Sequence, residues 1–224
     1  VNCTGLPAEG HVTSAWDIAL MSRELIEKHP DIRRYTTIWM DTLRDGTFQL
    51  ANTNKLIRFY DGATGLKTGS TDSAKYCLSA TAEREGMELI AVVLKSPTGQ
   101  QRFEDAKALL NYGFANFTAW TPPEESCAAV PVTLGRADTV ALRMEGDSVC
   151  VLEKSAVSTV EAKRRVPESL TAPVEEGQQV GELIVRNGGE TLLTVPLCAA
   201  ESVEAVTVFD LFGRFVRSVT GTEA

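Results

Sequence analysis

Two apolar runs joined by a short polar segment constrain the fold of this chain more than any other feature. Residues 76–82 alternate between apolar and polar side chains, and residues 89–94 are continuously apolar. Alternation is typical of a half-buried strand, whereas a short continuous run is typical of a strand buried on both faces. The segment between the two runs contains Gly86, which suits a turn. The sequence therefore predicts an antiparallel hairpin whose second strand lies deep in a sheet.

Helical patterns lie on both sides of this hairpin. Downstream, apolar residues recur at three- and four-residue spacing, which predicts a helix across the sheet. These residues are Phe103, Ala106, Leu110, Gly113, Phe114 and Phe117. Upstream, Thr13-Ser14 followed by Asp17 has the hydroxyl and acid spacing of a helix start, and Pro30 ends that helix. Between residues 31 and 60 we expect short strands and loops, with a turn at residues 45–46.

The pattern changes after Phe117. Residues 118–123 include Pro122-Pro123 and read as a linker, and short alternating runs follow it. The runs are residues 139–144, 148–152, 158–166 and 179–181, and then 182–185 with 192–197. Asn187-Gly188-Gly189 suits a tight turn between the last two runs. We expect a small β-sandwich here.

Composition excludes several classes of function. The net charge of −8 argues against a nucleic-acid partner, and the hydrophobic content of 43% is ordinary for a globular protein. The five cysteines are odd in number and scattered, so at least one is unpaired within the chain. No cluster has zinc-ligand spacing and no glycine-rich segment has phosphate-loop form. We therefore expect no metal and no other cofactor.

Residues 65–71 carry the most specific chemical signal. Lys67-Thr68-Gly69 places a cation at a strand end, and small hydroxyl residues, Ser70-Thr71, follow at once. In penicillin-interactive serine enzymes, a Lys-Thr-Gly strand holds the substrate carboxylate beside the nucleophile. The tripeptide alone is also compatible with a surface turn that carries a lysine. The surrounding segments decide between these interpretations.

Taken together, these segments make the chain resemble the serine-type D-alanyl-D-alanine carboxypeptidases, the low-molecular-mass penicillin-binding proteins of bacteria. The matching residues are Gly5-Leu6, Thr13-Ser14-Ala15, Leu50-Ala51-Asn52-Thr53-Asn54, residues 65–71, Ala74, Tyr76, Leu78 and Arg102. The resemblance covers residues 1 to about 117 and, more loosely, the remainder. The chain departs from the family at Lys75, where glycine is usual, and at Cys3-Thr4, where Pro-His is more usual.

The resemblance implies an α+β chain. Its first part would belong to a penicillin-binding-protein or β-lactamase-like domain, an antiparallel sheet with covering helices. A small β-sandwich and a carboxyl-terminal amphipathic helix would follow. We therefore expect a partial peptidase domain at residues 1–117, a linker at 118–123, the sandwich at 124–202 and the tail at 203–224.

The resemblance also implies roles for individual residues. Lys67 would supply positive charge and hold the proton network, and Thr68 would offer its hydroxyl to the substrate carboxylate. Gly69, which has no Cβ, would let the strand edge approach the substrate backbone. Ser70 would contribute its backbone N–H to the oxyanion hole. These assignments make Lys67 and Ser70 catalytic and Thr68 and Gly69 substrate-binding.

Arg102 is the candidate for a second contact with the substrate carboxylate. Its planar guanidinium matches the geometry of a carboxylate. Glu104 and Asp105 follow closely, so a solvated ion pair is the alternative interpretation of this arginine.

The nucleophile of the family is missing from this sequence. In the family it lies in a Ser-x-x-Lys motif, and a Ser-x-Asn motif supplies further groups. No serine of this chain has lysine three positions later or asparagine two positions later. The chain also begins at Val1 without a basic, apolar leader, although the resembling enzymes are exported. We expect residues 1–224 to be the carboxyl-terminal portion of a longer precursor, whose amino-terminal fragment completes the site.

The leading hypothesis is therefore a peptidase that trims the terminal D-alanine of peptidoglycan pentapeptide through a serine acyl-enzyme. Its partners would be peptides ending in D-Ala-D-Ala and β-lactams, at the extracytoplasmic face of the cell membrane. A β-lactamase or transpeptidase on the same fold is one alternative. A non-catalytic module that binds cell-wall peptide or a partner enzyme is the other.

The last residues suggest how the protein would reach the membrane. Apolar side chains fall on one face of a predicted helix, and polar ones fall on the other. The apolar face comprises Ala205, Val208, Phe209, Phe212, Phe215, Val216 and Val219, and the polar face Asp210, Arg214, Arg217 and Ser218. We expect reversible binding to a membrane surface, or alternatively packing against the sandwich or a partner.

Overall fold

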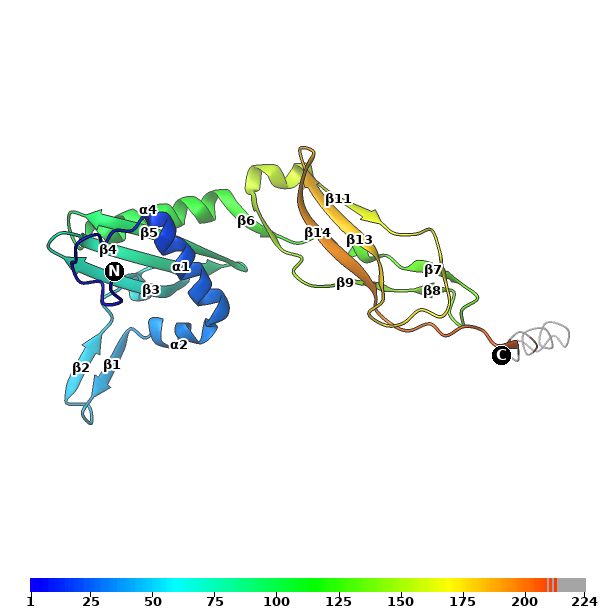
Figure 1. Cartoon of the computed structure of the whole chain (residues 1–224), viewed down its shortest axis with the longest axis horizontal. Coiled ribbons are helices and arrows are strands. Elements are labelled where there is room, and N and C mark those ends of the chain that lie inside the picture. Colours follow the sequence, from blue (N-terminus) through cyan, green and yellow to red (C-terminus); the bar gives the residue numbers. More distant parts are fainter. Residues whose placement is uncertain (209, 211, 213–224) are drawn as a thin grey trace. The chain divides into compact units, whose positions relative to one another are not determined.

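The computed structural model of the protein describes residues 1–208, 210 and 212. The chain divides into two compact units, Val1–Thr118 and Ala119–Ala224. The first unit contains a three-stranded antiparallel sheet in the order β3-β4-β5, shown in Figure 1. These strands are β3 (Ala63–Thr71), β4 (Lys75–Arg84) and β5 (Met87–Ser96).

The hairpin expected from the sequence is confirmed as β4 and β5. Its turn residues, Glu85 and Gly86, both have positive φ angles, 49° and 75°. Such a two-residue turn matches the twist of the strands that it joins. Arg84 pairs with Met87 at the start of the ladder, so the turn fixes the register of the hairpin.

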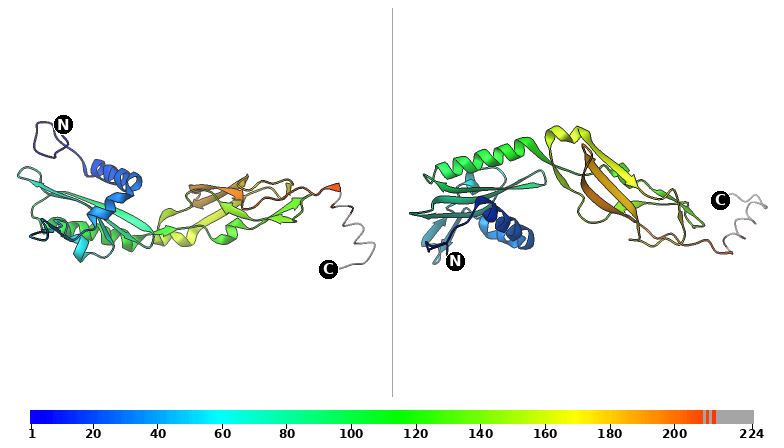
Figure 2. Two further views of the ribbon diagram at one scale, coloured as in Figure 1. Left: turned by 90° about the horizontal axis from the view of Figure 1, so that it is seen from below. Right: turned by 45° about the horizontal axis from the view of Figure 1, so that its top comes forward.

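Two helices cover opposite faces of this sheet, as Figures 1 and 2 show. They are α1 (Ala15–Lys28) and α4 (Gln101–Asn116). Alternate residues of β4 face the two helices, because Leu78 packs in a cluster with α4 residues whereas Ser79 hydrogen-bonds Ser22 of α1 at 2.7 Å. The helices expected from the spacing of apolar residues are therefore both present. However, α4 ends at Asn116, so Phe117, expected in the helix, and residues 118–120 of the expected linker instead form the strand β6 (Phe117–Trp120).

The beginning of α1 follows its sequence signals. Ser14 is the N-cap, and its side chain accepts a hydrogen bond from the Asp17 backbone while the Asp17 carboxylate accepts one from Ser14. This reciprocal arrangement is a capping box. Hydrogen bonds from the Ser14 side chain and backbone lower the pKa of Asp17. The Asp17 carboxylate therefore stabilises the folded state at pH values above its pKa in the unfolded chain. This stabilisation is lost as the pH falls through the lower pKa that Asp17 has in the folded state.

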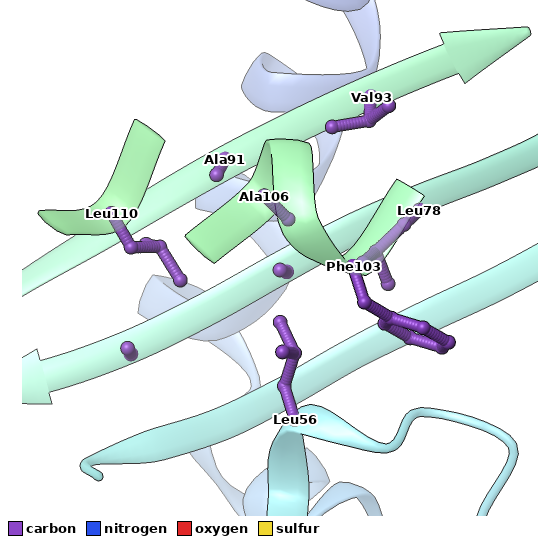
Figure 3. Close-up of a cluster of buried hydrophobic side chains, with 9 residues drawn as sticks. Leu56, Leu78, Ala91, Val93, Phe103, Ala106 and Leu110 are labelled. Carbon is purple, nitrogen blue, oxygen red and sulfur yellow. The ribbon is translucent and has the colours of Figure 1, made fainter. Parts of the chain in front are cut away.

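The main core of the first unit lies between α4 and the sheet. Figure 3 shows its side chains, which come from β4, β5, α4 and the short helix α3 (Leu56–Phe59). Ala80 and Ala106 are fully buried, so small side chains let the helix approach the sheet closely. Leu56 and Leu110 are each 1% exposed and fill the space beside them.

The segment between α1 and β3 holds more helix than the sequence indicated. It contains the expected strands β1 (Met40–Leu43) and β2 (Phe48–Ala51), which form a hairpin around the turn at residues 44–47. It also contains α2 (Arg33–Thr36), α3 and the 3-10 turn Pro30–Ile32, which we did not expect. Helices of three or four residues are too short to give a periodic signal.

The second unit is built almost entirely of strands. One sheet is four-stranded in the order β11-β13-β14-β9, and another is three-stranded in the order β12-β7-β8. The remaining strands, β6 and β10, pair with each other. The elements are β6 (Phe117–Trp120), η2 (Glu124–Cys127), β7 (Val130–Thr133), β8 (Thr139–Val140), β9 (Leu142–Met144), β10 (Cys150–Glu153), η3 (Lys154–Thr159), β11 (Val160–Arg165), β12 (Leu170–Thr171), β13 (Gln179–Asn187) and β14 (Glu190–Ala199). The expected β-rich architecture is confirmed.

The strand pairing of this unit partly follows the sequence. Gly188 and Gly189, with φ angles of 56° and 88°, form the expected turn between β13 and β14. β7 and β12 were not expected, and they pair in parallel although they lie far apart along the chain. All five cysteines, which fall within the described residues, are free thiols.

Most of the predicted amphipathic tail lies outside the described residues. Ala205 forms a bridge with Gly135, and the Asp210 carboxylate accepts hydrogen bonds from Thr207 and Arg136. None of the helices in the described part of the chain is long and apolar enough to cross a membrane.

The core of the first unit can be tested with two leucines on α4. Leu110→Ala should lower the free energy of unfolding by about 3 kcal/mol, because the side chain is 1% exposed and its removal leaves a cavity. Leu109→Ala is the matched control, since Leu109 is 50% exposed and should change the free energy by less than about 1 kcal/mol. Urea denaturation of both variants measures the difference, and equal losses would contradict this description of the core.

Candidate active site

The Lys-Thr-Gly segment lies in β3, at an edge of the three-stranded sheet. Lys67, Thr68 and Gly69 pair with Ser79, Leu78 and Cys77 of β4, so the sheet supports them on one side only. No other strand in the described residues pairs with the outer edge of β3. An extended chain can add to such an edge through backbone hydrogen bonds.

Lys67 is exposed and lies at a hollow of about 360 Å³ between α1 and the sheet. We call this the α1 hollow, and its lining is mostly aliphatic. The lining residues are Ile18, Met21, Ser22, Leu25, Ile32, Thr36, Leu66, Lys67 and Ser79. The Lys67 ammonium donates a hydrogen bond to the Thr68 carbonyl. An ammonium has three N–H donors, so others remain for an anion.

Thr68 is half-buried, and its hydroxyl oxygen lies 2.7 Å from that of Thr53. The loop that carries Thr53 is fixed by its neighbours. The buried Asn54 side chain donates to the Gly65 carbonyl at 2.8 Å, and the Asn52 side chain donates to the Ile38 carbonyl at 2.9 Å. The contact between Thr53 and Thr68 was not predicted from the sequence, although residues 50–54 were among those that carry the family resemblance. No signal in the sequence indicated this contact, because the fold brings the two hydroxyls together.

Gly69 and Ser70 are both exposed on the same strand. A Cβ added to Gly69 would meet no atom within 4 Å, and its φ angle lies outside the left-handed region. The packing of the described chain therefore does not require glycine at this position. The open space at Gly69 leaves room for a molecule outside the chain.

Arg102 is buried beside the end of β3. Its Nη1 donates to the carbonyls of Gly69 and Cys77, at 3.3 Å in each case, so it joins β3 to β4. Its guanidinium also lies over the rings of Tyr76 and Phe103, and burial lowers its pKa. Its Nε has no hydrogen-bond partner among the described atoms.

The alternative interpretation of Arg102 as a solvated ion pair does not hold in this structure. Glu104 instead pairs with Lys107 at 3.6 Å, and Asp105 accepts a hydrogen bond from Gln101. The structure shows Arg102 supporting the backbone of the Lys-Thr-Gly strand. Its contact with a substrate carboxylate stays a prediction, as do the roles of Lys67, Thr68, Gly69 and Ser70.

Comparison with protein families identifies two matching regions. Residues 1–98 match the family described as D-alanyl-D-alanine carboxypeptidase, and residues 123–205 match the C-terminal domain of penicillin-binding protein 5. The resemblance noted in the sequence is therefore confirmed.

Individual relatives agree with both matches. The chain is 35% identical over 212 residues to the D-alanyl-D-alanine carboxypeptidase DacF of Bacillus subtilis, covering 91% of this chain and 54% of the relative. It is 30% identical over 219 residues to the D-alanyl-D-alanine carboxypeptidase DacC of Escherichia coli, and the match covers 95% of this chain and 54% of that relative. The chain thus spans about half the length of the curated relatives that it matches.

A solved structure supports the same conclusion for the fold. Penicillin-binding protein 5 from Haemophilus influenzae matches with a TM-score of 0.64 and 27% identity, covering 89% of this chain and 59% of that protein. The combination of an antiparallel sheet with helices and a following β domain is therefore shared with a known protein.

The supporting role of Arg102 can be tested through stability. Arg102→Ala should lower the free energy of unfolding by about 2 kcal/mol, because it removes two hydrogen bonds to backbone carbonyls and the ring contacts. Glu104→Ala, on the same turn of α4, is the control and should change it by less than about 1 kcal/mol. Urea denaturation provides both values. Equal losses in the free energy of unfolding of the two variants would contradict the supporting role of Arg102.

Proposed function

This chain belongs to the D-alanyl-D-alanine carboxypeptidase family, and we propose on that basis that it forms the carboxyl-terminal portion of a serine-type enzyme. The enzyme would remove the terminal D-alanine from peptidoglycan pentapeptide through an acyl-enzyme. The observation that carries the proposal is the Lys67-Thr68-Gly69 segment on the open edge of a supported strand. An edge strand with a cation and a hydroxyl suits a peptide that ends in a carboxylate.

The carboxylate of the substrate would bind at Lys67 and Thr68. The Lys67 ammonium supplies the opposite charge. When Thr53 donates the hydrogen of the bond between the two threonine hydroxyls, the Thr68 hydrogen is free to donate to a carboxylate oxygen. Thr53 therefore orients the hydroxyl that the substrate needs.

Gly69 and Ser70 would act on the peptide bond that is cleaved. The space at Gly69 lets the peptide backbone lie close to the strand. The Ser70 backbone N–H would donate to the carbonyl oxygen of the penultimate residue, where negative charge develops during acyl transfer. The Ser70 side chain is not needed for this role.

The nucleophile would come from an amino-terminal segment of the precursor. The chain spans about half the length of the relatives that it matches, and it contains no Ser-x-x-Lys. The α1 hollow lies beside Lys67 and has an aliphatic lining in which Met21 is 61% exposed. The outer edge of β5 also has no strand partner in the described residues. We infer that the amino-terminal segment packs on these two surfaces and brings its serine to Lys67.

Two other functions remain distinguishable by experiment. A non-catalytic module is favoured by the missing Ser-x-x-Lys motif, and such a module cannot be acylated by penicillin in any form. A β-lactamase or transpeptidase would be acylated as well, but the names of the relatives favour the carboxypeptidase.

Lys67→Ala tests the carboxylate site in the protein completed with its amino-terminal segment. Acylation by a fluorescent penicillin should slow by at least about 100-fold, because the positive charge at the site is lost. Labelling followed by gel fluorescence measures the rate. Unchanged acylation would refute the assignment of Lys67.

Two further variants control this experiment. Lys28→Ala removes an exposed lysine that pairs with Glu24 on α1, and acylation should not change. Gly69→Ala keeps the charge and meets no atom of the chain, so thermal stability should be retained while acylation slows. Loss of acylation in Lys28→Ala would show that the assay reports general damage.

The tail would hold the protein at the extracytoplasmic membrane surface. Deletion of residues 213–224 removes Phe215, Arg214 and Arg217 but keeps the contacts of Ala205 and Asp210 with the second unit. Retention on liposomes of anionic lipid should fall, since one buried phenylalanine contributes about 2 kcal/mol. Cosedimentation measures retention, with neutral liposomes as the control. Equal retention with and without these residues would exclude residues 213–224 as the anchor.

A further inference from the structure

A second hollow, of about 650 Å³, lies at the far end of the Lys-Thr-Gly strand. We call it the lysine pocket. Its lining includes Ser70, Thr71, Asp72, Lys75 and Tyr76 of the β3–β4 turn region, together with Lys95 of β5. The pocket therefore begins at Ser70, the residue proposed to bind the carbonyl of the scissile bond.

The charges of this pocket favour an anion. Lys75 and Lys95 are exposed, and neither forms an ion pair in the part of the chain that the structure describes. Asp72 supplies one carboxylate against these two ammonium groups. The balance is one positive charge in a hollow whose lining also includes Ser70 and Thr71.

Both lysines have backbone conformations that lysine rarely adopts. The φ angle is 53° at Lys75 and 56° at Lys95, in the left-handed region that glycine enters most easily. The chain therefore retains two ammonium groups at positions whose backbone favours a residue without a side chain.

The roles proposed for β3 fix the direction of a bound peptide. Its terminal carboxylate lies at Thr68, and the carbonyl of the preceding residue lies at Ser70, so the peptide runs antiparallel to β3. Residues in an extended chain are about 3.3 Å apart along the strand. The residue before the terminal D-Ala-D-Ala therefore lies near Thr71, at the lysine pocket.

We propose that the lysine pocket binds a carboxylate on the side chain of the peptide residue that precedes D-Ala-D-Ala. This inference rests on the proposed function, because the peptide direction comes from it. Lys75 and Lys95 supply the ammonium groups, and Asp72 disfavours a second negative charge. The pocket would make the protein prefer stem peptides whose third residue from the end is acidic.

The test uses three N-acetylated tripeptides, X-D-Ala-D-Ala, in which X is glutamate, glutamine or lysine. Binding to the protein completed with its amino-terminal segment, whose nucleophilic serine is replaced by alanine so that no peptide is cleaved, is measured by isothermal titration calorimetry at low salt. A peptide amide that lacks the terminal carboxylate is the reference. The glutamate peptide should bind about fivefold more tightly than the glutamine peptide, as expected for an exposed charge pair worth about 1 kcal/mol. The lysine peptide should bind more weakly than both.

Glycine substitutions provide the matched variants. Lys75→Gly and Lys95→Gly remove the ammonium groups and suit the left-handed backbone, so thermal unfolding midpoints should not fall. The double variant should lose the preference for glutamate while its affinity for the glutamine peptide is unchanged. Lys28→Ala, far along the sequence on α1, should keep the preference.

The outcomes separate this inference from the proposed function. Equal affinity for all three tripeptides, or a preference that survives in the double glycine variant, would overturn the lysine pocket and leave the proposed function standing. If no tripeptide binds more tightly than the peptide amide, the carboxylate site at Lys67 and Thr68 fails, and the inference fails with it.

Discussion

The packing of α4 against β4 is the contact on which the candidate site depends. Ala80 and Ala106 are fully buried, and only small side chains at both positions allow the helix to lie this close to the sheet. Because α4 is held there, Arg102 in its first turn reaches the carbonyls of Gly69 and Cys77. The edge strand that carries Lys67 and Thr68 is thus supported by its ladder with β4 and by a cation that bridges the two strands.

Much of the first unit could be predicted from the sequence because its elements are long and periodic. The ten-residue strands β4 and β5 and the helices α1 and α4 each give several repeats of their pattern. The helices α2 and α3 have four residues each, which is about one turn and too short for a repeat. In the second unit, the parallel pairing of β7 with β12 joins distant segments and leaves no local signal.

The candidate site was predicted in part. The Lys67-Thr68-Gly69 motif can be recognised in the sequence because it places a cation, a hydroxyl and a glycine at three consecutive positions. The bond between Thr53 and Thr68 and the two contacts of Arg102 were not predictable, because they involve hydroxyls or backbone carbonyls brought together by the fold. The left-handed backbone conformation at Lys75 and Lys95 could not be predicted from the sequence either, because lysine rarely adopts it.

The outer edge of β5, which pairs with no strand in the described residues, has a consequence for handling this polypeptide. Its continuous apolar run, residues 89–94, presents unused backbone donors and acceptors, which act as a template for any other extended segment. Produced by itself, the chain is thus prone to edge-to-edge self-association and precipitation at high concentration. Natural proteins avoid such association by covering the exposed edge of a sheet. We therefore expect this polypeptide to be more soluble when another segment covers the outer edge of β5.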